Sequence, residues 1–511
     1  GIGSKNHLLL FQIACIYMFV FVYTKMDLII EKLLKDKESV MDSSAGKSKS
    51  GFVENRSIDF IPENERHGSI FAQFTLWFGA NLQITAIVTG ALAVVLGGDV
   101  FWSIIGLFIG QCFGAAVMAL HAAQGPKLGL PQMISSRVQF GVYGACIPII
   151  LVCLMYIGFT ATGEVLAGKA IAHLAQVSNT TGILIYACFI IIFATIGYRL
   201  IHWVGKVASV IGLIAFVIIL TQILALSNIS ELLAVRHFSW SSFLLAVSLS
   251  ASWQISFGPY VADYSRYLPT KTSSTRVFWA VGLGSLIGSQ ISMMLGVFIA
   301  QVSNGGFVGN EVQYVVGMNP IALVITFLYF SIAFGKVTLS TLNAYGSFMC
   351  IATIWNSFKP SAQISKLTRL TIVLAMVIIS TFIAVVGEHT FLSAFKSFIL
   401  FLLTFFIPWS AINLVDYYFI SKEECDVNAL YDPNGKYGRW NTIGIACYCI
   451  GILLQLPFID SKFYKGQIAE MLGGVDLSWL VGLLSTAVLY YVLAKRAQIK
   501  ISKALQLERV K

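Results

Sequence analysis

The sequence has very little charge for its length. Only 11% of its 511 residues are Asp, Glu, Lys or Arg, while 57% are hydrophobic. Soluble globular domains average about 25% charged residues, so the composition excludes that class. The mean hydropathy of +0.79 favours a helical membrane protein. The net charge of +10 does not indicate a nucleic-acid partner, because the basic residues lie in short loops, where they set topology.

Motifs for metal binding, disulfide bonding and catalysis are also missing. The nine cysteines include no CxxC pair, and most lie in apolar runs as small core residues. The seven histidines are scattered, without partners at metal-ligand spacing. No HExxH motif, nucleophile triad order or phosphate-binding Gly loop falls at a usable place. We therefore expect no enzymatic activity and no cofactor beyond a coupling ion.

Residues 1–69 precede the main unit and combine an extra hydrophobic segment with a polar tail. Leu8 to Thr24 is an apolar stretch near the lower length limit for a span. It is interpreted in three ways: as an extra helix with its N-terminus outside, as an uncleaved signal-like segment, or as upstream sequence preceding a start at Met26 or Met41. We favour the third. Ser39 to His67 is polar and predicts a mobile cytoplasmic tail.

Twelve apolar segments follow, and together they predict a polytopic membrane domain over residues 70–495. Every second loop is basic, with Arg137 and Arg266 as examples, so both ends of this unit are predicted to be cytoplasmic. The opposite loops carry fewer basic residues, such as Lys169, and residues 496–511 are predicted as a cytoplasmic tail. Gly305 to Gly317 is predicted to be an outer loop across the mouth of the protein. The predicted spans are 70–96, 100–124, 142–168, 181–198, 204–226, 243–262, 277–302, 320–353, 368–388, 392–417, 440–458 and 477–495.

Spans 1 and 6 both carry signs of an interruption. Span 6 contains Gly258-Pro259, and a proline inside a helix frees a carbonyl that must find another partner in lipid. Span 1 contains Gly79 and Gly90 around Asn81. The two spans are five apart and so run in opposite directions, and paired broken helices indicate a transporter site near the midplane. The alternative is a simple proline kink in span 6 and close packing at the glycines of span 1.

Three ionisable residues lie well inside the predicted spans: Glu164, Lys336 and Lys396. A charge in lipid costs at least about 2.5–3.5 kcal/mol and marks a candidate functional residue. Lys396 is close enough to a span end to snorkel, so we assign it no role. Glu164 and Lys336 are predicted to face the central cavity and to interact directly or through a water or ligand. The alternative places them at different depths, with the Lys336 ammonium on backbone carbonyls.

Polar and aromatic side chains recur on single helix faces. Trp253 and Phe257 are four residues apart, so they can clamp a flat polar molecule or simply pack. Ser340 and Thr341 offer the oxygen ligands that a small cation prefers, although back-bonding to the preceding turn is the alternative. Two further faces are formed by Tyr156, Thr160 and Glu164 in span 3 and by Lys336, Ser340 and Asn343 in span 8.

Three stretches resemble the nucleobase:cation symporter family, which contains the purine–cytosine permeases. The first is LWFGAN at 76–81, and the most specific is WQISFGPYVADYSRYLP at 253–269. The third is PWSAINLVDYY at 408–418, followed by GKYGRWN at 435–441. The likeness runs from about Phe71 to about Tyr491 and leaves the first apolar stretch outside.

The resemblance implies an all-α fold of twelve transmembrane helices with alternating access. Two inverted five-helix repeats would occupy 70–226 and 243–417, with broken helices 1 and 6, and two extra C-terminal helices would occupy 440–495. In that family a span 6 tryptophan stacks on the flat substrate, and Trp253 matches it. Tyr156 and Thr160 match a span 3 aromatic and a hydrogen-bonding group, where relatives often have Trp and Gln, so the identity of the substrate stays open.

The resemblance also implies the other site residues. Lys336, beside the implied cation ligands, is a departure from the family, because its ammonium would repel or replace sodium. Coupling to sodium and coupling to protons therefore both remain open, with Lys336 and Glu164 as candidate coupling charges. The further substrate-binding residues would be Gln254, Phe257, Glu164, Asn343 and Asn81, and the sodium ligands would be Asn81, Ile84, Val337, Ser340 and Thr341.

We therefore predict a secondary active importer, a symporter of a nucleobase such as cytosine or a purine, or of a related heterocycle, in the cytoplasmic membrane. Stacking suits such ligands because their faces are apolar and their edges need hydrogen bonds. We expect no nucleic-acid partner and no obligatory protein partner. The alternatives are a transporter of the same fold for an amino acid or vitamin-like amine, and a channel or sensor. Channels carry charge rings or filter loops, which the sequence does not show.

Overall fold

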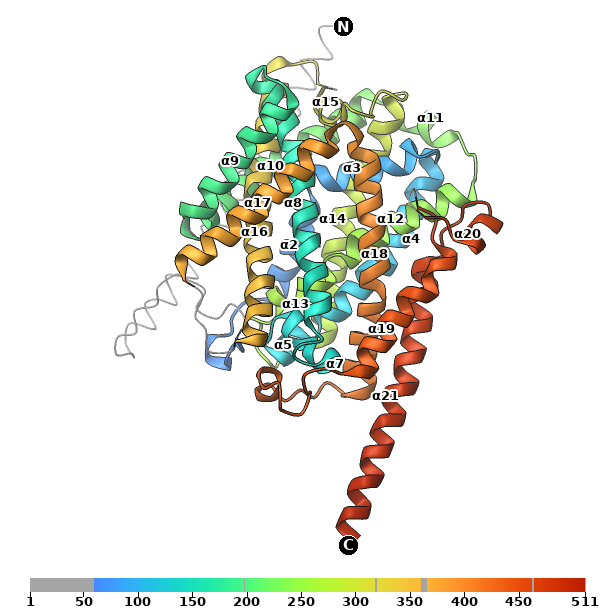
Figure 1. Cartoon of the computed structure of the whole chain (residues 1–511). Coiled ribbons are helices and arrows are strands. Elements are labelled where there is room, and N and C mark those ends of the chain that lie inside the picture. Colours follow the sequence, from blue (N-terminus) through green and yellow to red (C-terminus); the bar gives the residue numbers. More distant parts are fainter. Residues whose placement is uncertain (1–58, 197, 318, 360–364, 462–463, 511) are drawn as a thin grey trace.

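Long apolar runs in this chain become helices because lipid offers backbone N–H and C=O groups no other hydrogen-bond partners. The computed structural model of the chain is a bundle of long tilted helices, and its described part contains no strand beyond one isolated bridge between Asp460 and Lys465 (Figure 1). The predictions for Leu8 to Thr24 lie outside the described residues. The structure describes residues 59–196, 198–317, 319–359, 365–461 and 464–510.

Every predicted span coincides with a helix or with a pair of helices. The long helices of the first half are α2 (Ile70–Asn81), α3 (Ile84–Val95), α4 (Val100–Ala122), α8 (Cys146–Ala175), α9 (Asn179–Ile196) and α10 (Tyr198–Leu226). Those of the second half are α12 (Trp240–Ile255), α13 (Gly258–Ser265), α14 (Ser274–Val302), α16 (Ala322–Phe358), α17 (Lys366–Gly387), α18 (Phe391–Val415), α19 (Thr442–Gln455) and α21 (Ser478–Val510).

Short helices fill the connections. They are η1 (Glu63–Glu65), α5 (Gly125–Leu128), α6 (Gln132–Ser135), α7 (Arg137–Phe140), α11 (Ile229–Ala234), α15 (Glu311–Gly317), η2 (Glu388–Thr390), the π-helical η3 (Asp416–Ile420), η4 (Asn428–Tyr431), η5 (Leu456–Phe458) and α20 (Gln467–Met471). At the C-terminal end, α21 continues as a helix beyond residue 495, where the last span was predicted to end (Figure 1).

Length and composition identify seven membrane-spanning candidates among the described residues, or eight if α2 and α3 form one broken span. One of the seven, Leu367–Ile420, contains both α17 and α18, and Figure 1 shows the chain turning between them. Two shorter apolar helices lie at Asn179–Ala194 and Thr442–Phe458. The chain is therefore multi-pass, and the assignment of twelve spans stays a prediction.

Span 1 divides without a proline or glycine at the break. α2 ends at Asn81, α3 begins at Ile84, and the two helices meet at 57°. Gly90 has a packing role instead: a Cβ there would lie 2.1 Å from the Met293 carbonyl oxygen of α14. The glycine therefore allows α3 and α14 to approach closely, and the polar sequence around Asn81 marks the break.

Span 6 divides one turn earlier than a kink at its proline would suggest. α12 ends at Ile255, and Gly258 and Pro259 open the separate helix α13. Proline is tolerated in a first helical turn because the N–H it lacks would have no partner there. Ser256 and Phe257 are the two residues between the helices.

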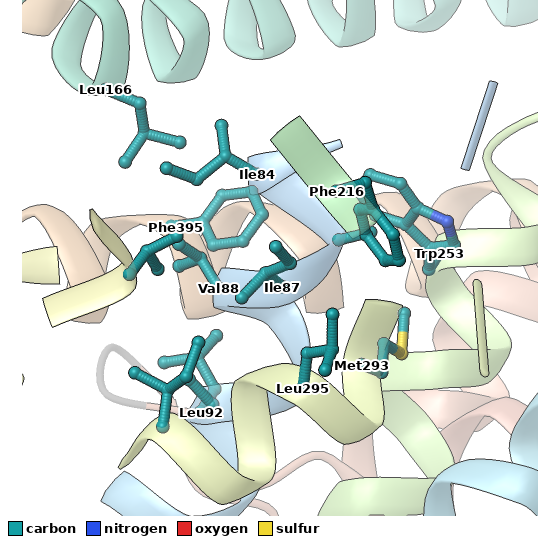
Figure 2. Close-up of a cluster of buried hydrophobic side chains, with 14 of the residues drawn as sticks. Ile84, Ile87, Val88, Leu92, Leu166, Phe216, Trp253, Met293, Leu295 and Phe395 are labelled. Carbon is teal, nitrogen blue, oxygen red and sulfur yellow. The ribbon is translucent and has the colours of Figure 1, made fainter. Parts of the chain in front are cut away.

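The core of the bundle is built around α3. Figure 2 shows Ile87 and Leu92 of α3 beside Leu295 of α14, with Phe216 of α10 and Trp253 of α12 at the other edge of the same cluster. All five side chains are buried. Nearly all of α3 is thus buried in this apolar core, whereas only Gln73, Trp77 and Asn81 of α2 are buried.

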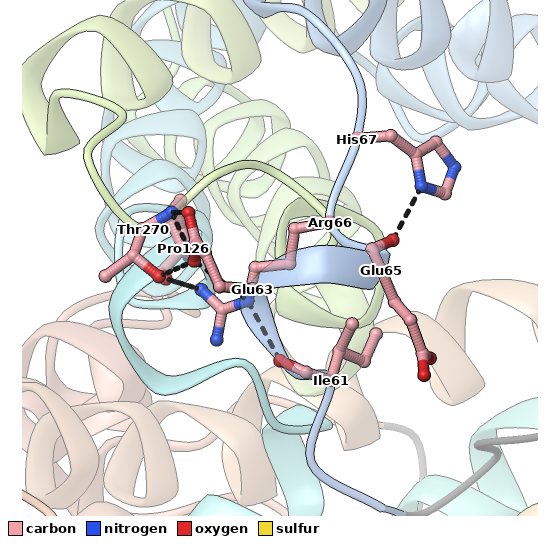
Figure 3. Close-up of polar contacts among 7 residues, drawn as sticks. All are labelled: Ile61, Glu63, Glu65, Arg66, His67, Pro126 and Thr270. Atoms are coloured by element: carbon pink, nitrogen blue, oxygen red, sulfur yellow. Dashed lines mark hydrogen bonds and ion pairs between the residues drawn. The ribbon is translucent and has the colours of Figure 1, made fainter. Parts of the chain in front are cut away.

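The end of the predicted mobile tail is ordered. Residues 59–67 dock on the cytoplasmic-loop segments predicted between spans 2 and 3 and between spans 6 and 7 (Figure 3). The Arg66 guanidinium donates to the Pro126 carbonyl, and the Glu63 carboxylate accepts from the backbone N–H and hydroxyl of Thr270. The Thr270 hydroxyl and the Arg66 charge lower the pKa of Glu63. This part of the tail prediction was therefore wrong, because hydrogen bonds to both loops hold the segment.

Two basic residues predicted to lie in solvated loops are buried. Arg137, in α7, is fully buried and donates to the Leu430 carbonyl and the Ser357 hydroxyl. Lys169, in α8, is 2% exposed and forms an ion pair of 2.5 Å with Glu311 of α15. The ion pair fastens the segment predicted as an outer loop to α8.

Candidate functional site

The break in span 1 is joined to Trp253 by a hydrogen bond. The Trp253 indole Nε1 donates to Asn81 Oδ1 at 2.7 Å. Asn81 Nδ2 donates in turn to the Trp77 carbonyl at 2.7 Å and to Ser285 Oγ at 3.0 Å. Asn81 is fully buried and Trp253 is 2% exposed. Asn81 therefore closes the end of α2 and fixes the orientation of the indole.

Aromatic rings surround Trp253. Its ring centroid lies 6.0 Å from Phe159 and 5.7 Å from Phe257, both nearly perpendicular to the indole. Phe257 also lies 5.3 Å from Trp77, which stands one turn before Asn81 in α2. Edge-to-face pairs of this kind favour one fixed arrangement. The sequence indicated Trp253 and Phe257, but Phe159 gave no signal beyond being one aromatic residue in an apolar span.

Span 3 contributes Tyr156 and Thr160 in different ways. The Tyr156 ring lies 5.7 Å from Tyr260 and covers Gly346 of α16, where a Cβ would come within 2.6 Å of it. Tyr156 thus joins the aromatic group through α13. The Thr160 hydroxyl donates to the Tyr156 carbonyl at 2.8 Å, so its hydrogen is used within the helix.

Gln254 was predicted to bind substrate, but its amide is engaged elsewhere. Its Nε2 donates to Gln111 Oε1 at 2.6 Å and to Ser289 Oγ at 2.8 Å, and its Oε1 accepts from Ser285 Oγ at 2.5 Å. Neighbouring residues on a helix point about 100° apart, so Gln254 faces α4 and α14 while Trp253 faces the aromatic group. The same Ser285 hydroxyl accepts from Asn81 Nδ2, so the structure links Gln254 to Asn81 through Ser285.

Lys336 reaches the break in span 1. Its ammonium donates to Gln83 Oε1 at 2.8 Å and to the Thr85 hydroxyl. Gln83 precedes α3 and Thr85 stands in its first turn. In the part of the chain that the structure describes, no carboxylate lies within ion-pair distance of Lys336. The side chain is 7% exposed, so this is a buried ammonium on neutral oxygen atoms.

Glu164 and Lys336 form no direct ion pair in the part of the chain that the structure describes, and their predicted contact through a water or ligand stays a prediction. Glu164 is fully buried and accepts hydrogen bonds from the Ser380 and Thr381 hydroxyls of α17, at 3.1 and 3.2 Å. Its second oxygen has no hydrogen-bond partner among the described residues. The two charges are separated because α17 supplies hydroxyl donors on one side of α8, while the span 1 break supplies acceptors to Lys336. Glu164 therefore lies apart from the aromatic group.

The predicted cation ligands of span 8 lie next to Lys336. A Cβ on Gly163 would lie 2.9 Å from Ser340 Oγ and 3.7 Å from the Lys336 side chain, so both residues meet α8 at this glycine. Ser340 accepts from the Tyr186 hydroxyl at 2.9 Å. Thr341 donates to the Val337 carbonyl at 2.7 Å, the predicted back-bonding alternative.

Two predicted residues remain to be placed. Ile84 opens α3, between the Gln83 and Thr85 side chains that receive the Lys336 ammonium. Asn343 is half-buried on α16, where its carbonyl accepts from Ser347 at 2.9 Å. No role was predicted for Gln83 or Thr85, and their position beside Asn81 in a span predicted to be interrupted was the signal that could have assigned them.

Comparison with known proteins places this geometry in a family. Residues 60–482 match the model of a permease family for cytosine and purines, uracil, thiamine and allantoin. The chain is 37% identical over 444 residues to the Bacillus subtilis protein named "Putative purine-cytosine permease YxlA", covering 87% of this chain and 96% of that one. It is 23% identical over 471 residues to the purine-cytosine permease fcyB of Emericella nidulans, covering 86% and 88%.

A solved structure shares the fold. The inward-facing conformation of Mhp1 superposes with a TM-score of 0.71 at 17% identity, covering 89% of this chain and 96% of that one. The resemblance read from the three sequence stretches is therefore confirmed, and so is the expectation of a transporter rather than an enzyme. The match over most of its length shows that this chain belongs to the family of permeases for cytosine and purines, uracil, thiamine and allantoin.

Proposed function

We propose that this protein imports a nucleobase such as cytosine or a purine, or a closely related heterocycle, by secondary active transport. The observation that carries this is the buried hydrogen bond between Asn81 and Trp253. It joins the break of span 1 to an indole set among aromatic rings, next to the break of span 6 at Phe257. Aromatic rings bind the faces of a planar heterocycle, and broken helices offer polar groups to its edges.

The proposed architecture is twelve spans in two inverted five-helix repeats, at 70–226 and 243–417, followed by two extra helices. The helix bounds support it, because a pair of helices stands in each of spans 1 and 6. Basic residues at the predicted inner loops support cytoplasmic ends. Trp253, Phe257, Tyr156 and Asn81 are the proposed substrate-site residues.

We further propose that protons drive the uptake. The residues fit a sodium ion poorly, because Lys336 brings its own positive charge beside Ser340 and takes the Gln83 and Thr85 oxygens of the span 1 break. A buried lysine is a group that can release and rebind a proton during a transport cycle. When protonated, Lys336 would hold α16 to the break of span 1, and when neutral it would release that contact.

The experiment that tests the proposed function is uptake into cells that lack their own nucleobase transporters. Radiolabelled cytosine, adenine, hypoxanthine, uracil and allantoin are offered separately, with an amino acid as a negative compound. We expect accumulation of one or two heterocycles above their outside concentration, abolished by a protonophore. Equilibration without accumulation would indicate a channel, and uptake of the amino acid alone would contradict the assigned substrate class.

A further inference from the structure

A second group of polar side chains lies away from Trp253, at the end of the bundle that carries α20 (Figure 1). It surrounds a cavity of about 200 Å³, many times the space that one water molecule requires. By the predicted topology this is the outer end of the protein. We call the cavity the vestibule. Its lining residues are Leu96, Ser241, Ser242, Leu245, Ser248, Lys396, Leu400, Asp460, Gly474 and Asp476.

Ser248 shows that the vestibule has unmet hydrogen-bonding capacity. It is 1% exposed, and its hydroxyl has no hydrogen-bond partner among the described residues. The other buried serines of α12 behave differently: Ser250 donates to the Ala246 carbonyl and Ser252 to the Ile399 carbonyl. A buried polar group without a partner costs about 1–3 kcal/mol. A hydroxyl in this position is therefore open to a ligand in the cavity.

Lys396 and Asp460 supply opposite charges to the same cavity. Lys396 is half-buried and makes no ion pair or side-chain hydrogen bond within the described residues. Asp460 lines the cavity with a carboxylate that also forms no ion pair there. Asp476 is different, because its two oxygens accept from the backbone N–H groups of Asp460 and Ser478, at 3.0 and 2.9 Å. Asp476 thus stabilises the loop that contains Asp460, while the Lys396 and Asp460 side chains line the vestibule without such partners.

The chemistry of this lining selects a particular ligand edge. An ammonium and a carboxylate across one small cavity are both satisfied by a neutral molecule that carries a carbonyl next to an N–H group. The carbonyl would accept from Lys396, the N–H would donate to Asp460, and the amphoteric Ser248 hydroxyl could serve either neighbour. Amide edges of this kind occur in pyrimidines, purines and cyclic ureides.

The vestibule and Trp253 share the same helices. Ser248 and Trp253 are five residues apart on α12, about 7.5 Å of helix rise. Between them, Ser252 ties α12 to the Ile399 carbonyl of α18, and Phe398 packs edge-on against Phe159. Phe159 in turn contacts Trp253. A ligand in the vestibule would therefore be separated from the Trp253 site by one layer of aromatic side chains.

We propose that the vestibule is a second binding site for the transported heterocycle, which the molecule occupies before it passes the Phe159–Phe398 layer to Trp253. This inference rests on the proposed function and adds to it a second, outer binding site that is formed by different residues. Lys396, Asp460 and Ser248 are its specificity-determining residues, none of which belongs to the Trp253 site.

The test is the number of ligand molecules bound by the purified protein in detergent. Equilibrium dialysis with radiolabelled cytosine, or with the panel compound that gives the highest uptake, should saturate at two molecules per chain for the wild type. Lys396→Met and Ser248→Ala should each weaken one of the two sites roughly tenfold or more, as expected for losing a hydrogen bond to a charged or buried group. Trp253→Ala should weaken the other.

Matched controls separate this effect from general damage. Lys465→Met removes the same charge from an exposed position in the loop next to Asp460, and Ser397→Ala removes a hydroxyl beside Lys396 that only bonds the Ser393 carbonyl. Both should bind two molecules. A wild type that saturates at one molecule, or a Lys396→Met variant that still binds two with wild-type affinity, would overturn the vestibule proposal. A wild type that neither takes up nor binds any heterocycle would instead refute the proposed function.

Discussion

Among the described residues two lysines are buried, and they are stabilised in opposite ways. Lys169 in α8 is 2% exposed and has the Glu311 carboxylate at 2.5 Å. Lys336 in α16 is 7% exposed and donates to two neutral side chains of the broken first span. A buried charge is tolerated when it is paired and hydrogen-bonded. Lys169 meets that condition, whereas Lys336 has hydrogen bonds but no opposite charge.

The difference separates a structural contact from the contact that we propose to be functional. The Lys169–Glu311 pair connects a long helix to the short helix α15, and both charges are satisfied in place. Lys336 contacts elements that a transporter must move relative to one another. Because its hydrogen-bond partners are neutral, loss of a proton from Lys336 would not leave a buried carboxylate without a counter-charge. The expected effects of changing these two lysines and the residues of the site run from the largest to the smallest as follows.

The largest effect is expected for Lys336→Met. The variant keeps the length of the side chain but removes the proposed proton carrier, so accumulation of substrate should fall to the background of empty cells. Binding of the heterocycle to the purified protein should persist, because Trp253 is unchanged, and it should lose its pH dependence. Lys465→Met, at an exposed lysine, should accumulate substrate normally. Accumulation by Lys336→Met at the wild-type level would exclude the lysine from coupling.

The second effect concerns stability. Glu311→Gln or Lys169→Met alone strands a buried charge and should cost about 3–5 kcal/mol of unfolding free energy, measured by denaturant unfolding in detergent. The double variant Lys169→Met/Glu311→Gln should recover much of that loss, because Gln can still accept from the Gly309 N–H that Glu311 accepts now. If the two single losses simply add in the double variant, the pair contributes nothing as a pair.

Trp253→Ala is expected to have an intermediate effect. Loss of stacking should weaken binding of the heterocycle by roughly 1–3 kcal/mol, as for bases stacked on aromatic side chains. Trp253→Phe should retain part of the stacking while losing the bond to Asn81. Trp409, also fully buried but packed on His121, provides the control as Trp409→Phe. Equal affinities for Trp253→Ala and the wild type would remove Trp253 from the site.

The smallest effect is expected at the predicted sodium ligands. If Lys336 fulfils the role of the cation, the double variant Ser340→Ala/Thr341→Val should change the response of uptake to sodium by less than about twofold, because no sodium ion needs those oxygens. A clear sodium stimulation in the wild type that the double variant loses would restore the sodium interpretation.

The sequence predicted the helices well, because hydropathy is a local property that each segment carries by itself. At both predicted interruptions one helix ends and another begins, with Pro259 opening a helix instead of kinking one. That these are broken membrane spans stays a prediction. Burial of individual polar side chains was harder. Arg137 was assigned to a solvated loop but is fully buried against the Leu430 carbonyl. The hydrogen-bond partners of Arg137 come from segments far away in the chain, so the sequence around Arg137 does not predict them.

At the candidate site too, the sequence did not predict which side chains contact one another. Trp253 was identified by its motif, but its hydrogen bond to Asn81 joins two spans that only the folded bundle brings together. Gln254, its neighbour in the same motif, was predicted to bind substrate, and the folded chain places its amide against Gln111 of α4. Helical spacing tells which residues share a face, but it does not tell which neighbour that face meets.

The most direct test of the account uses the purified protein in liposomes, with proton and sodium gradients imposed separately. An inward proton gradient without sodium should drive accumulation of the transported heterocycle, and an inward sodium gradient at equal pH on both sides should not. Lys336→Met liposomes should accumulate nothing under either gradient. Accumulation driven by sodium alone at equal pH would contradict the claim that the Lys336 ammonium has taken the place of the coupling cation.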